Sequence, residues 1–140
     1  MKQIVWTDEF SVGIESLDNQ HKQIIGFINR LAEDKDVSSR SKTLHEILYE
    51  MMQYSLEHFM HEEKLLIETG YQDLINHKDL HARYIEKYSD LSMAAMKSSS
   101  DSLTSELLEF LVLWWENHIL EEDMKCKTFL TDQMRATLGK

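Results

Sequence analysis

Proline is absent from this chain, cysteine occurs once, and glycine occurs only four times in 140 residues. With so few residues that interrupt a helix, and with abundant leucine, methionine, glutamate and lysine, the composition predicts an all-α fold. The single cysteine, Cys126, has no partner for an internal disulfide. A disulfide framework is therefore excluded, and a reducing compartment, the cytoplasm, is the expected location.

The sequence also lacks long apolar runs and any surplus of positive charge. No apolar stretch reaches the roughly 18 residues that span a bilayer, and the N-terminus has no basic segment followed by an apolar one. We therefore expect neither a membrane span nor a secretion signal. A formal net charge of −10 repels phosphate backbones and anionic lipid surfaces, so nucleic acid and membranes are not expected partners.

Apolar residues recur at three- and four-residue steps along four segments, which is the pattern of helices that bury one face. The expected helices cover about 17–33, 41–68, 74–97 and 101–121. Ser16 is expected to cap the first helix, and Gly70 to end the second. A polar run at 33–41 and a serine-rich run at 98–102 are expected to form turns.

The two ends of the chain follow different patterns. Residues 1–16 are too irregular for a helix and too apolar for a disordered tag, so we expect an arm that packs on the helices. Residues 125–137 predict a short C-terminal helix. Connections this short make neighbouring helices antiparallel. The expected fold is one domain over 1–140, an up-down-up-down antiparallel four-helix bundle with an N-terminal arm and a short C-terminal helix.

Metal-ligand residues occur in pairs one helical turn apart. Residues at i and i+4 lie within about 40° of one direction, so His58 and Glu62 face a common space, as do His77 and His81. A lone pair of this kind also fits an ordinary amphipathic helix. Here, however, the histidines of both pairs and His118 fall on apolar stripes, where polar groups are costly unless partnered. Convergence on a bound metal would satisfy them together.

The pair His118 and Asp123 has a different spacing. Five residues separate their positions along the chain, which places them about 140° apart on an ideal helix. Both can serve one site only if the helix tightens or ends between them. We therefore predict that the helix breaks near Glu121 or Glu122 and that Asp123 folds back toward the bundle. Those two glutamates compete for this role and also fit solvated acids.

With His21 on the first helix, the candidates are five imidazoles and two carboxylates. Nitrogen and carboxylate donors without thiolate suit iron, manganese or, less well, zinc, whereas a structural zinc needs only four ligands. Seven ligands imply two ions. Two octahedral ions have twelve positions, and five imidazoles, two bridging carboxylates and one bridging oxygen atom fill all but one of them. The remaining position suits a small diatomic molecule.

These residues resemble the hemerythrin family, in particular the small single-domain bacterial hemerythrins. The resemblance covers nearly the whole chain. It rests on Trp6, on the runs Ser11-Val12-Gly13-Ile14, Asp18-Asn19-Gln20-His21, His58-Phe59-Met60-His61-Glu62-Glu63, Gly70-Tyr71 and His77 to His81, and on Trp114 with His118-Ile119 and Asp123.

The resemblance implies a non-heme di-iron centre with an oxo or hydroxo bridge. In that family, matching positions assign one iron to His77, His81 and His118, the other to His21 and His58, and the bridging carboxylates to Glu62 and Asp123. Dioxygen binds reversibly at the iron with fewer ligands, which His21 and His58 hold here.

The resemblance also implies an oxygen pocket whose walls exclude water and protons. The residues that match its walls are Ile24, Phe59, Trp114, Trp115 and Ile119. The helical spacing of these residues also fits ordinary side chains of the hydrophobic core with no role in an oxygen pocket. Trp115 stands where the family usually has a smaller aliphatic residue, so its indole would narrow the pocket, change its access path or present an N–H to bound ligand.

The expected function is reversible dioxygen binding, for carriage, storage or buffering, and not catalysis. Two alternatives stay open at this point. One is an oxygen or redox sensor that acts through a separate partner protein. The other is a di-iron peroxidase or a nitric oxide-handling activity, against which we count the lack of an evident acid or base beside the open position.

Overall fold

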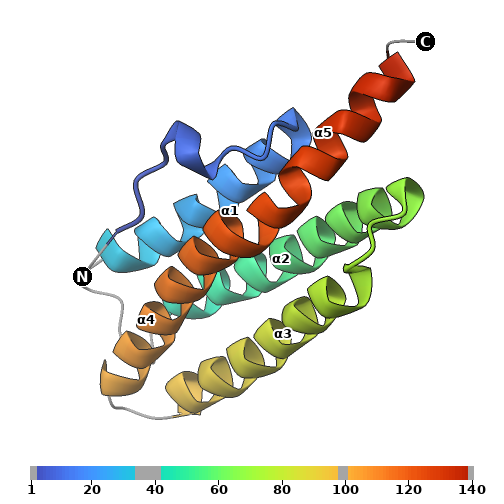
Figure 1. Cartoon of the computed structure of the whole chain (residues 1–140). Helices are drawn as coiled ribbons and strands as arrows, with labels where there is room; N and C mark the ends of the chain where they lie inside the picture. The colour runs from blue at the N-terminus through green and yellow to red at the C-terminus, as the bar shows by residue number, and fades with distance from the viewer. Residues whose placement is uncertain (1–2, 34–41, 98–100, 139–140) are drawn as a thin grey trace.

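The computed structural model describes residues 3–33, 42–97 and 101–138, which are helical apart from the arm and one turn (Figure 1). The elements are the 3₁₀ turn η1 (Asp8–Phe10), α1 (Glu15–Glu33), α2 (Lys42–Thr69), α3 (Leu74–Lys97), α4 (Asp101–Asn117), the π-helical turn η2 (His118–Asp123) and α5 (Met124–Leu138). No strand occurs in these ranges.

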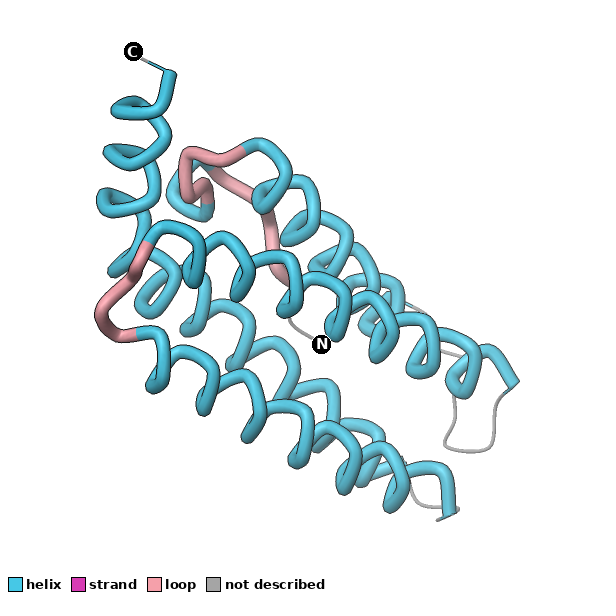
Figure 2. Tube along the Cα trace, turned by 90° about the vertical axis from the view of Figure 1, so that its right-hand side faces the viewer, coloured by secondary structure: helices cyan, strands magenta, loops and turns pink. Residues whose placement is uncertain are grey.

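Helices α1 to α4 lie side by side with alternating direction (Figures 1 and 2). Consecutive helices contact each other, and α4 also contacts α1, which closes the bundle around one core. The expected antiparallel four-helix bundle with an arm and a C-terminal helix is therefore confirmed. Most of the polar run at 33–41, the start of the serine-rich run at 98–102 and the first two residues of the arm lie outside the described residues.

The turn between α2 and α3 follows the sequence prediction for Gly70. This glycine has a φ of 74°, in the left-handed region that other residues rarely adopt. The N–H of Tyr71 donates to the carbonyl of Leu66 (3.0 Å), and the N–H of Gly70 donates to that of Ile67 (3.2 Å). This is a Schellman ending of α2. It reverses the chain within a few residues, so the last turns of α2 lie beside the first turns of α3.

The cap predicted for α1 is wrong. Helix α1 begins at Glu15, so Ser16 lies inside its first turn instead of preceding it. The Ser16 hydroxyl lies 3.1 Å from Nε2 of His61 on α2. Ser16 therefore links the start of α1 to α2 by a side-chain contact at the surface.

The break predicted near Glu121 or Glu122 is also wrong. Helix α4 passes through η2 into α5 without leaving helical backbone geometry, and Asn117 and Met124, which flank η2, are both in the right-handed helical region. Together α4, η2 and α5 form one rod whose end extends past the other helices (orange to red in Figure 1). One widened helical turn, and not a break, therefore accommodates the five-residue spacing of His118 and Asp123.

The N-terminal arm packs on the bundle as expected. The N–H of Ile4 donates to the side-chain oxygen of Asn29 on α1, and the Asn29 amide donates back to the Ile4 carbonyl, both at 2.8 Å. Farther along, the carboxylate of Asp18 accepts the N–H of Val12 (2.8 Å) and the hydroxyl of Ser11 (2.5 Å). Two side chains of α1 therefore satisfy arm backbone that forms no regular ladder.

The arm and α5 meet over the end of α1 and α2 that lies nearest the α2–α3 turn. A second apolar cluster fills this contact, formed by Val12, Ile14, Leu17, Leu66, Cys126 and Leu130. Gly13 has a φ of 77°, and a Cβ atom there would lie 2.9 Å from the methyl group of Thr131 on α5. The close approach of arm and α5 thus requires glycine at this position.

Within the described residues, no helix is both long and apolar enough to cross a membrane.

The paired hydrogen bonds of Asn29 give a test of the arm. Replacing Asn29 by alanine leaves the Ile4 N–H and carbonyl without partners, and we expect a loss of about 1–3 kcal/mol in the free energy of unfolding. Urea denaturation measures the change. Asn19→Ala, at an exposed position of the same helix, is the control, and equal losses in the two variants would show that Asn29 does not hold the arm.

Candidate metal centre

All seven residues that the sequence singled out meet inside one end of the bundle. His21 comes from α1, His58 and Glu62 from α2, His77 and His81 from α3, and His118 and Asp123 from η2. Each is at least 96% buried. The surroundings are apolar side chains of the core. A cluster of five imidazoles and two carboxylates is therefore withdrawn from water, where each polar atom depends on the others.

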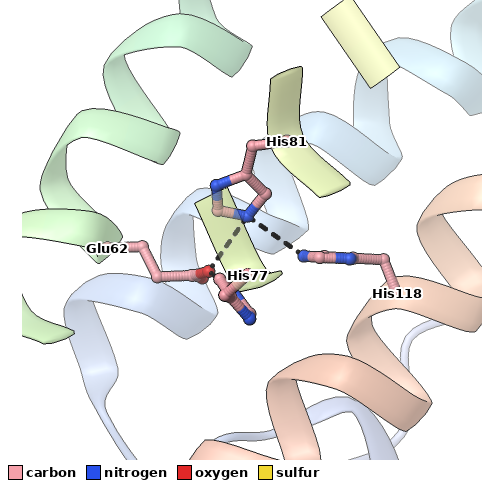
Figure 3. A group of neighbouring side chains, drawn as sticks. All are labelled: Glu62, His77, His81 and His118. Carbon is pink, nitrogen blue, oxygen red and sulfur yellow. Dashed lines mark hydrogen bonds and ion pairs between the residues drawn. The ribbon is translucent and has the colours of Figure 1, made fainter. Parts of the chain in front are cut away.

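Glu62 turns its two oxygens toward different imidazoles. Oε1 lies 2.5 Å from Nε2 of His77 and 3.3 Å from Nε2 of His81, the side drawn in Figure 3. Oε2 lies 3.4 Å from Nε2 of His58 and 3.8 Å from Nε2 of His21. One carboxylate therefore separates the imidazoles into a group on α3 and a group on α1 and α2.

Asp123 divides its oxygens in the same way. Oδ1 lies 3.2 Å from Nε2 of His118 and 3.3 Å from Nε2 of His77. Oδ2 lies 3.2 Å from Nε2 of His21. His118 also approaches His81, with 3.1 Å between their Nε2 atoms. Both carboxylates thus face a three-histidine group on one side and a two-histidine group on the other.

The π-helical turn is the reason that His118 and Asp123 reach the same place. On an ideal α-helix, residues five apart point in directions about 140° apart. In a π-helix the hydrogen bond closes at i+5, so residues five apart lie over one another. Turn η2 begins at His118 and ends at Asp123. A single widened turn therefore aims both side chains at the cluster within a continuous helix.

Two further side chains orient the imidazoles from outside the cluster. Nδ1 of His58 donates to the side-chain oxygen of Gln20 (2.7 Å), and Nδ1 of His81 donates to the carboxylate of Glu63 (2.8 Å). These bonds fix the tautomer and leave each Nε2 lone pair facing the cluster. Glu63 directly follows Glu62 in the sequence, and Gln20 directly precedes His21 in the family-like run, but helical spacing gave Gln20 no role.

The cluster contains buried atoms that the protein itself leaves without a hydrogen bond. These are both nitrogens of His21, Nε2 of His58 and both oxygens of Asp123. An unsatisfied buried polar atom costs about 1–3 kcal/mol. Imidazole nitrogens and carboxylate oxygens that converge in one buried space are the donors that a transition-metal cation binds, so the residues fit a metal site.

Among the described residues, three sets of donor atoms are close enough to hold a metal ion, and two of them consist of imidazole and carboxylate donors alone. The first consists of Glu62, His77, His81 and His118, and the second of His21, His58 and Glu62; within each set the donors lie within 4.8 Å of one another. Glu62 belongs to both sets. Imidazole and carboxylate donors suit iron and related transition metals.

Cys126 lies close enough to His77 and Asp123 to form a third set of possible donors. Its Sγ, however, donates to the backbone carbonyl of Asp123 (3.1 Å). Burial, together with the charges of Asp123 and Glu62, raises the pKa of the thiol well above its ordinary value. Cys126 therefore stays a protonated, buried side chain packed in the second apolar cluster.

The carboxylates control protonation of the metal-free cluster. Burial lowers the pKa of His21 and His77, but the carboxylates of Asp123 and Glu62 outweigh it and raise the pKa to about 9 and about 10, respectively. Burial lowers the pKa of His58. Burial alone would raise the pKa of Glu62, yet contacts with four histidines hold it well below its ordinary value. The carboxylates are ionised and at least two histidines are cationic at neutral pH.

Three of the five aromatic or aliphatic residues assigned to the pocket contact the imidazoles directly. Phe59 stacks on His81 with ring centroids 3.8 Å apart, and Trp114 stacks on His118 at 4.3 Å. Trp115 is fully buried 6.0 Å from His58 and 6.3 Å from His21, measured between ring centroids. Ile24 and Ile119 are fully buried in the same core.

The Trp115 indole N–H does not point to the cluster as a free donor. It donates to the hydroxyl of Tyr84 at 3.0 Å. Burial raises the pKa of Tyr84, so its hydroxyl stays protonated. Of the alternatives raised by the sequence, a bulky wall beside His21 and His58 matches this arrangement, and a donor to bound ligand does not.

Known proteins share both the sequence pattern and the fold. The family pattern described as hemerythrin HHE cation binding domain matches residues 12–130. The bacteriohemerythrin of Clostridium acetobutylicum is 32% identical over 122 residues, which cover 85% of this chain and 95% of that protein. The bacteriohemerythrin of Pseudomonas aeruginosa is 33% identical over 123 residues, which cover 88% of this chain and 78% of that protein.

Solved structures agree with these relatives. A crystal structure of wild-type hemerythrin matches with a TM-score of 0.80 and 26% identity, over 92% of this chain and 98% of that one. The chain belongs to the hemerythrin family. Membership supports a cation-binding role for the buried histidines and carboxylates described above.

Metal binding should release protons from this cluster. Because the pKa values of His21 and His77 are raised to about 9 and about 10, both imidazoles carry an extra proton at pH 7, and a metal at Nε2 displaces it. We expect ferrous iron to release at least two protons at pH 7 and to bind more tightly as the pH rises toward 9. Anaerobic calorimetry in buffers of different ionisation enthalpy counts the protons. Heats that do not depend on the buffer would contradict this expectation.

The bond from His81 to Glu63 should contribute to metal affinity. Glu63→Ala removes the acceptor that orients the imidazole, and we expect iron affinity to fall by about tenfold to hundredfold. Competition with a chelator measures the affinity. Glu57→Ala, at an exposed position of the same helix, is the matched control. If both variants bind iron like the parent protein, Glu63 does not position His81.

Proposed function

We propose that the cluster binds two iron ions and that the chain uses them to bind dioxygen reversibly. The observation that carries the proposal is the division of each carboxylate between two groups of imidazoles. A single metal needs only one group of nitrogens beside each carboxylate, whereas here the two oxygens of Glu62 and of Asp123 face separate sets of nitrogens. Two neighbouring ions bridged by both carboxylates fit this arrangement.

The two ions would have unequal sets of protein donors. His77, His81 and His118 would hold one, His21 and His58 the other, and Glu62 and Asp123 both. The side of the cluster formed by His21 and His58, next to Trp115, would be the one open to dioxygen. Two ferrous ions held by these residues would supply the electrons that reversible dioxygen binding requires.

The contribution of the chain to reversibility is to keep water and free protons away. Trp115 and Phe59 are stacked 5.6 Å apart and cover the imidazoles with apolar surface, and Ile24 and Ile119 complete the same core. The Trp115 N–H is bonded to Tyr84 and is therefore not offered to the site. A dry site favours release of intact dioxygen over its loss in a reduced form. Carriage, storage or local buffering would each use this property.

One spectroscopic experiment tests the proposal. The protein is reconstituted with ferrous iron, its iron content is measured, and visible spectra are recorded under oxygen and after the gas is removed. We expect about two irons per chain, from the two groups of donors, and an absorption band that appears with oxygen and disappears without it. Immediate conversion to an oxygen-insensitive ferric state would overturn the proposal, and multiple turnovers with hydrogen peroxide and a reducing dye would favour a peroxidase.

Trp115 should determine how long the oxygen-binding state lasts. Trp115→Leu removes the bulky wall beside His21 and His58 and admits water, so we expect autoxidation to become several-fold faster. Trp115→Phe keeps an aromatic wall while removing the hydrogen bond to Tyr84, so we expect its autoxidation rate to lie between those of the parent protein and Trp115→Leu. The rate at which the oxygen-dependent band decays measures the effect. Equal decay in all three proteins would mean that Trp115 does not line the oxygen pocket.

A further inference from the structure

A groove on the outside of the bundle leads to the same metal cluster from a different side. It lies between α3 and α4, has a volume of about 510 Å³ and is open to solvent. Its apolar lining comes from Leu80, Phe110, Leu113 and Trp114, and it reaches His118. His118 is 4% exposed, the highest value among the seven residues of the cluster. The groove is therefore a place where solvent and the cluster come close.

Trp114 connects the groove with the cluster. Its indole is half-buried in the groove wall and lies almost parallel to the His118 imidazole, with centroids 4.3 Å apart and planes 12° apart. The Nε2 atom of that imidazole faces His81 and Asp123. A molecule in the groove therefore lies next to His118, a proposed iron ligand, and next to the Trp114 ring that stacks on it.

The groove has a strongly negative rim. Glu106, Glu109, Glu121 and Glu122 line it together with one lining cation, Lys87, and Lys125 forms an ion pair with Glu122 (3.0 Å), which leaves three rim glutamates without an ion pair to that lysine. Lys87 places its ammonium 5.2 Å from the centre of the Phe110 ring. An apolar floor with an acidic rim favours a partner that has an exposed flat or apolar centre surrounded by positive charge.

We propose that this groove receives a one-electron reductant with a basic face and that Trp114 is the contact through which the electron reaches the cluster. The inference rests on the proposed di-iron function, because an oxygen carrier whose iron has autoxidised needs an external reductant. Each encounter oxidises the reductant by one electron and reduces one ferric ion to ferrous. Two encounters restore the ferrous pair. The transfer itself makes and breaks no covalent bond.

The role of Trp114 in electron transfer follows from the distance that the electron must cross between the groove and the cluster. Electron transfer between separated centres slows steeply as the gap widens, and the cluster is buried on every side that the structure describes. On the two-histidine side the covering ring, Trp115, is fully buried, whereas Trp114 is only partly covered. A reductant in the groove therefore approaches the three-histidine side, while the expected oxygen position lies on the other.

A pair of charged probes tests docking in the iron-loaded, autoxidised protein. The reductants are reduced methyl viologen, a cation, and its sulfonatopropyl analogue, which has a similar potential and the opposite charge. Stopped-flow absorption gives the rate of iron reduction at low ionic strength. We expect the cation to react faster, and salt to narrow the difference. Equal rates for the two probes would overturn a docking site with a negative rim.

Two charge-reversal variants separate the groove from net charge alone. Glu106→Lys with Glu109→Lys changes the rim, and Glu50→Lys with Glu57→Lys makes the same charge change at exposed positions on α2. We expect the rim variant to slow reduction by methyl viologen about tenfold, and the control variant to slow it far less. If both variants slow it equally, only net charge steers the reductant and the groove has no part.

Substitutions of Trp114 test the electron contact. Trp114→Leu removes the ring that lies on His118, and Trp114→Phe keeps a ring there. At equal iron content we expect several-fold slower reduction in Trp114→Leu and rates near those of the parent in Trp114→Phe. Reduction of Trp114→Leu at the parent rate would show that the electron takes another path.

A measurement without iron separates this inference from the oxygen-binding proposal. In a Trp6→Phe background, Trp114 and the buried Trp115 are the remaining indoles. Oxidised methyl viologen should quench Trp114 fluorescence before iron is added, and the Glu106→Lys, Glu109→Lys variant should weaken the quenching. Absence of quenching would overturn docking at Trp114, whatever the loaded protein does with oxygen.

Discussion

Two buried carboxylates shared among five imidazoles are the arrangement on which the rest of this structure depends. Glu62 and Asp123 each face both histidine groups, so removing either would leave several imidazoles buried without a counter-charge. Helices α2 and α3 and turn η2, which continues α4, each contribute two side chains to the cluster, and α1 contributes His21. The bundle therefore has its most polar point inside one end of its apolar core, where four helices must be in correct register at once.

The periodicity of the sequence was sufficient to predict the helices. His58, Glu62, His77 and His81 were predicted from one-turn spacing together with the apolar stripes on which the histidines fall, because the α-helix brings i and i+4 together. His118 and Asp123 required more, since their spacing showed that an ordinary helix fails and led to the prediction of a break, whereas the structure has a widened turn. A π-helical turn is stabilised by what its side chains meet in the folded protein, and that information is not local.

The contacts that sequence periodicity missed are those between distant segments. Gln20 bonds His58 across 38 residues, and Ser16 meets His61 across 45. Neither bond follows from helix propensity or apolar spacing. Trp115 shows the same limit, because its partner Tyr84 lies on α3 and only the packed bundle shows that the indole N–H is occupied. The two sides of the cluster also differ in a way that only tertiary structure reveals. The buried Trp115 covers the two-histidine side, and a solvent-exposed groove lies beside the three-histidine side.

The π-helical turn has a consequence for how the molecule tolerates insertions and deletions. Because η2 holds one residue more than an α-helical turn, it changes the phase of everything that follows by about 100°. The face of α5 that carries Cys126 and Leu130 is turned toward the arm and α2 by this offset. A single-residue deletion in η2 would restore α-helical spacing between His118 and Asp123 and keep α5 in phase, whereas a single-residue insertion would misplace Asp123 and turn the C-terminal helix away from the N-terminal arm. The two ends of the chain are clamped together by the same irregularity that completes the polar cluster.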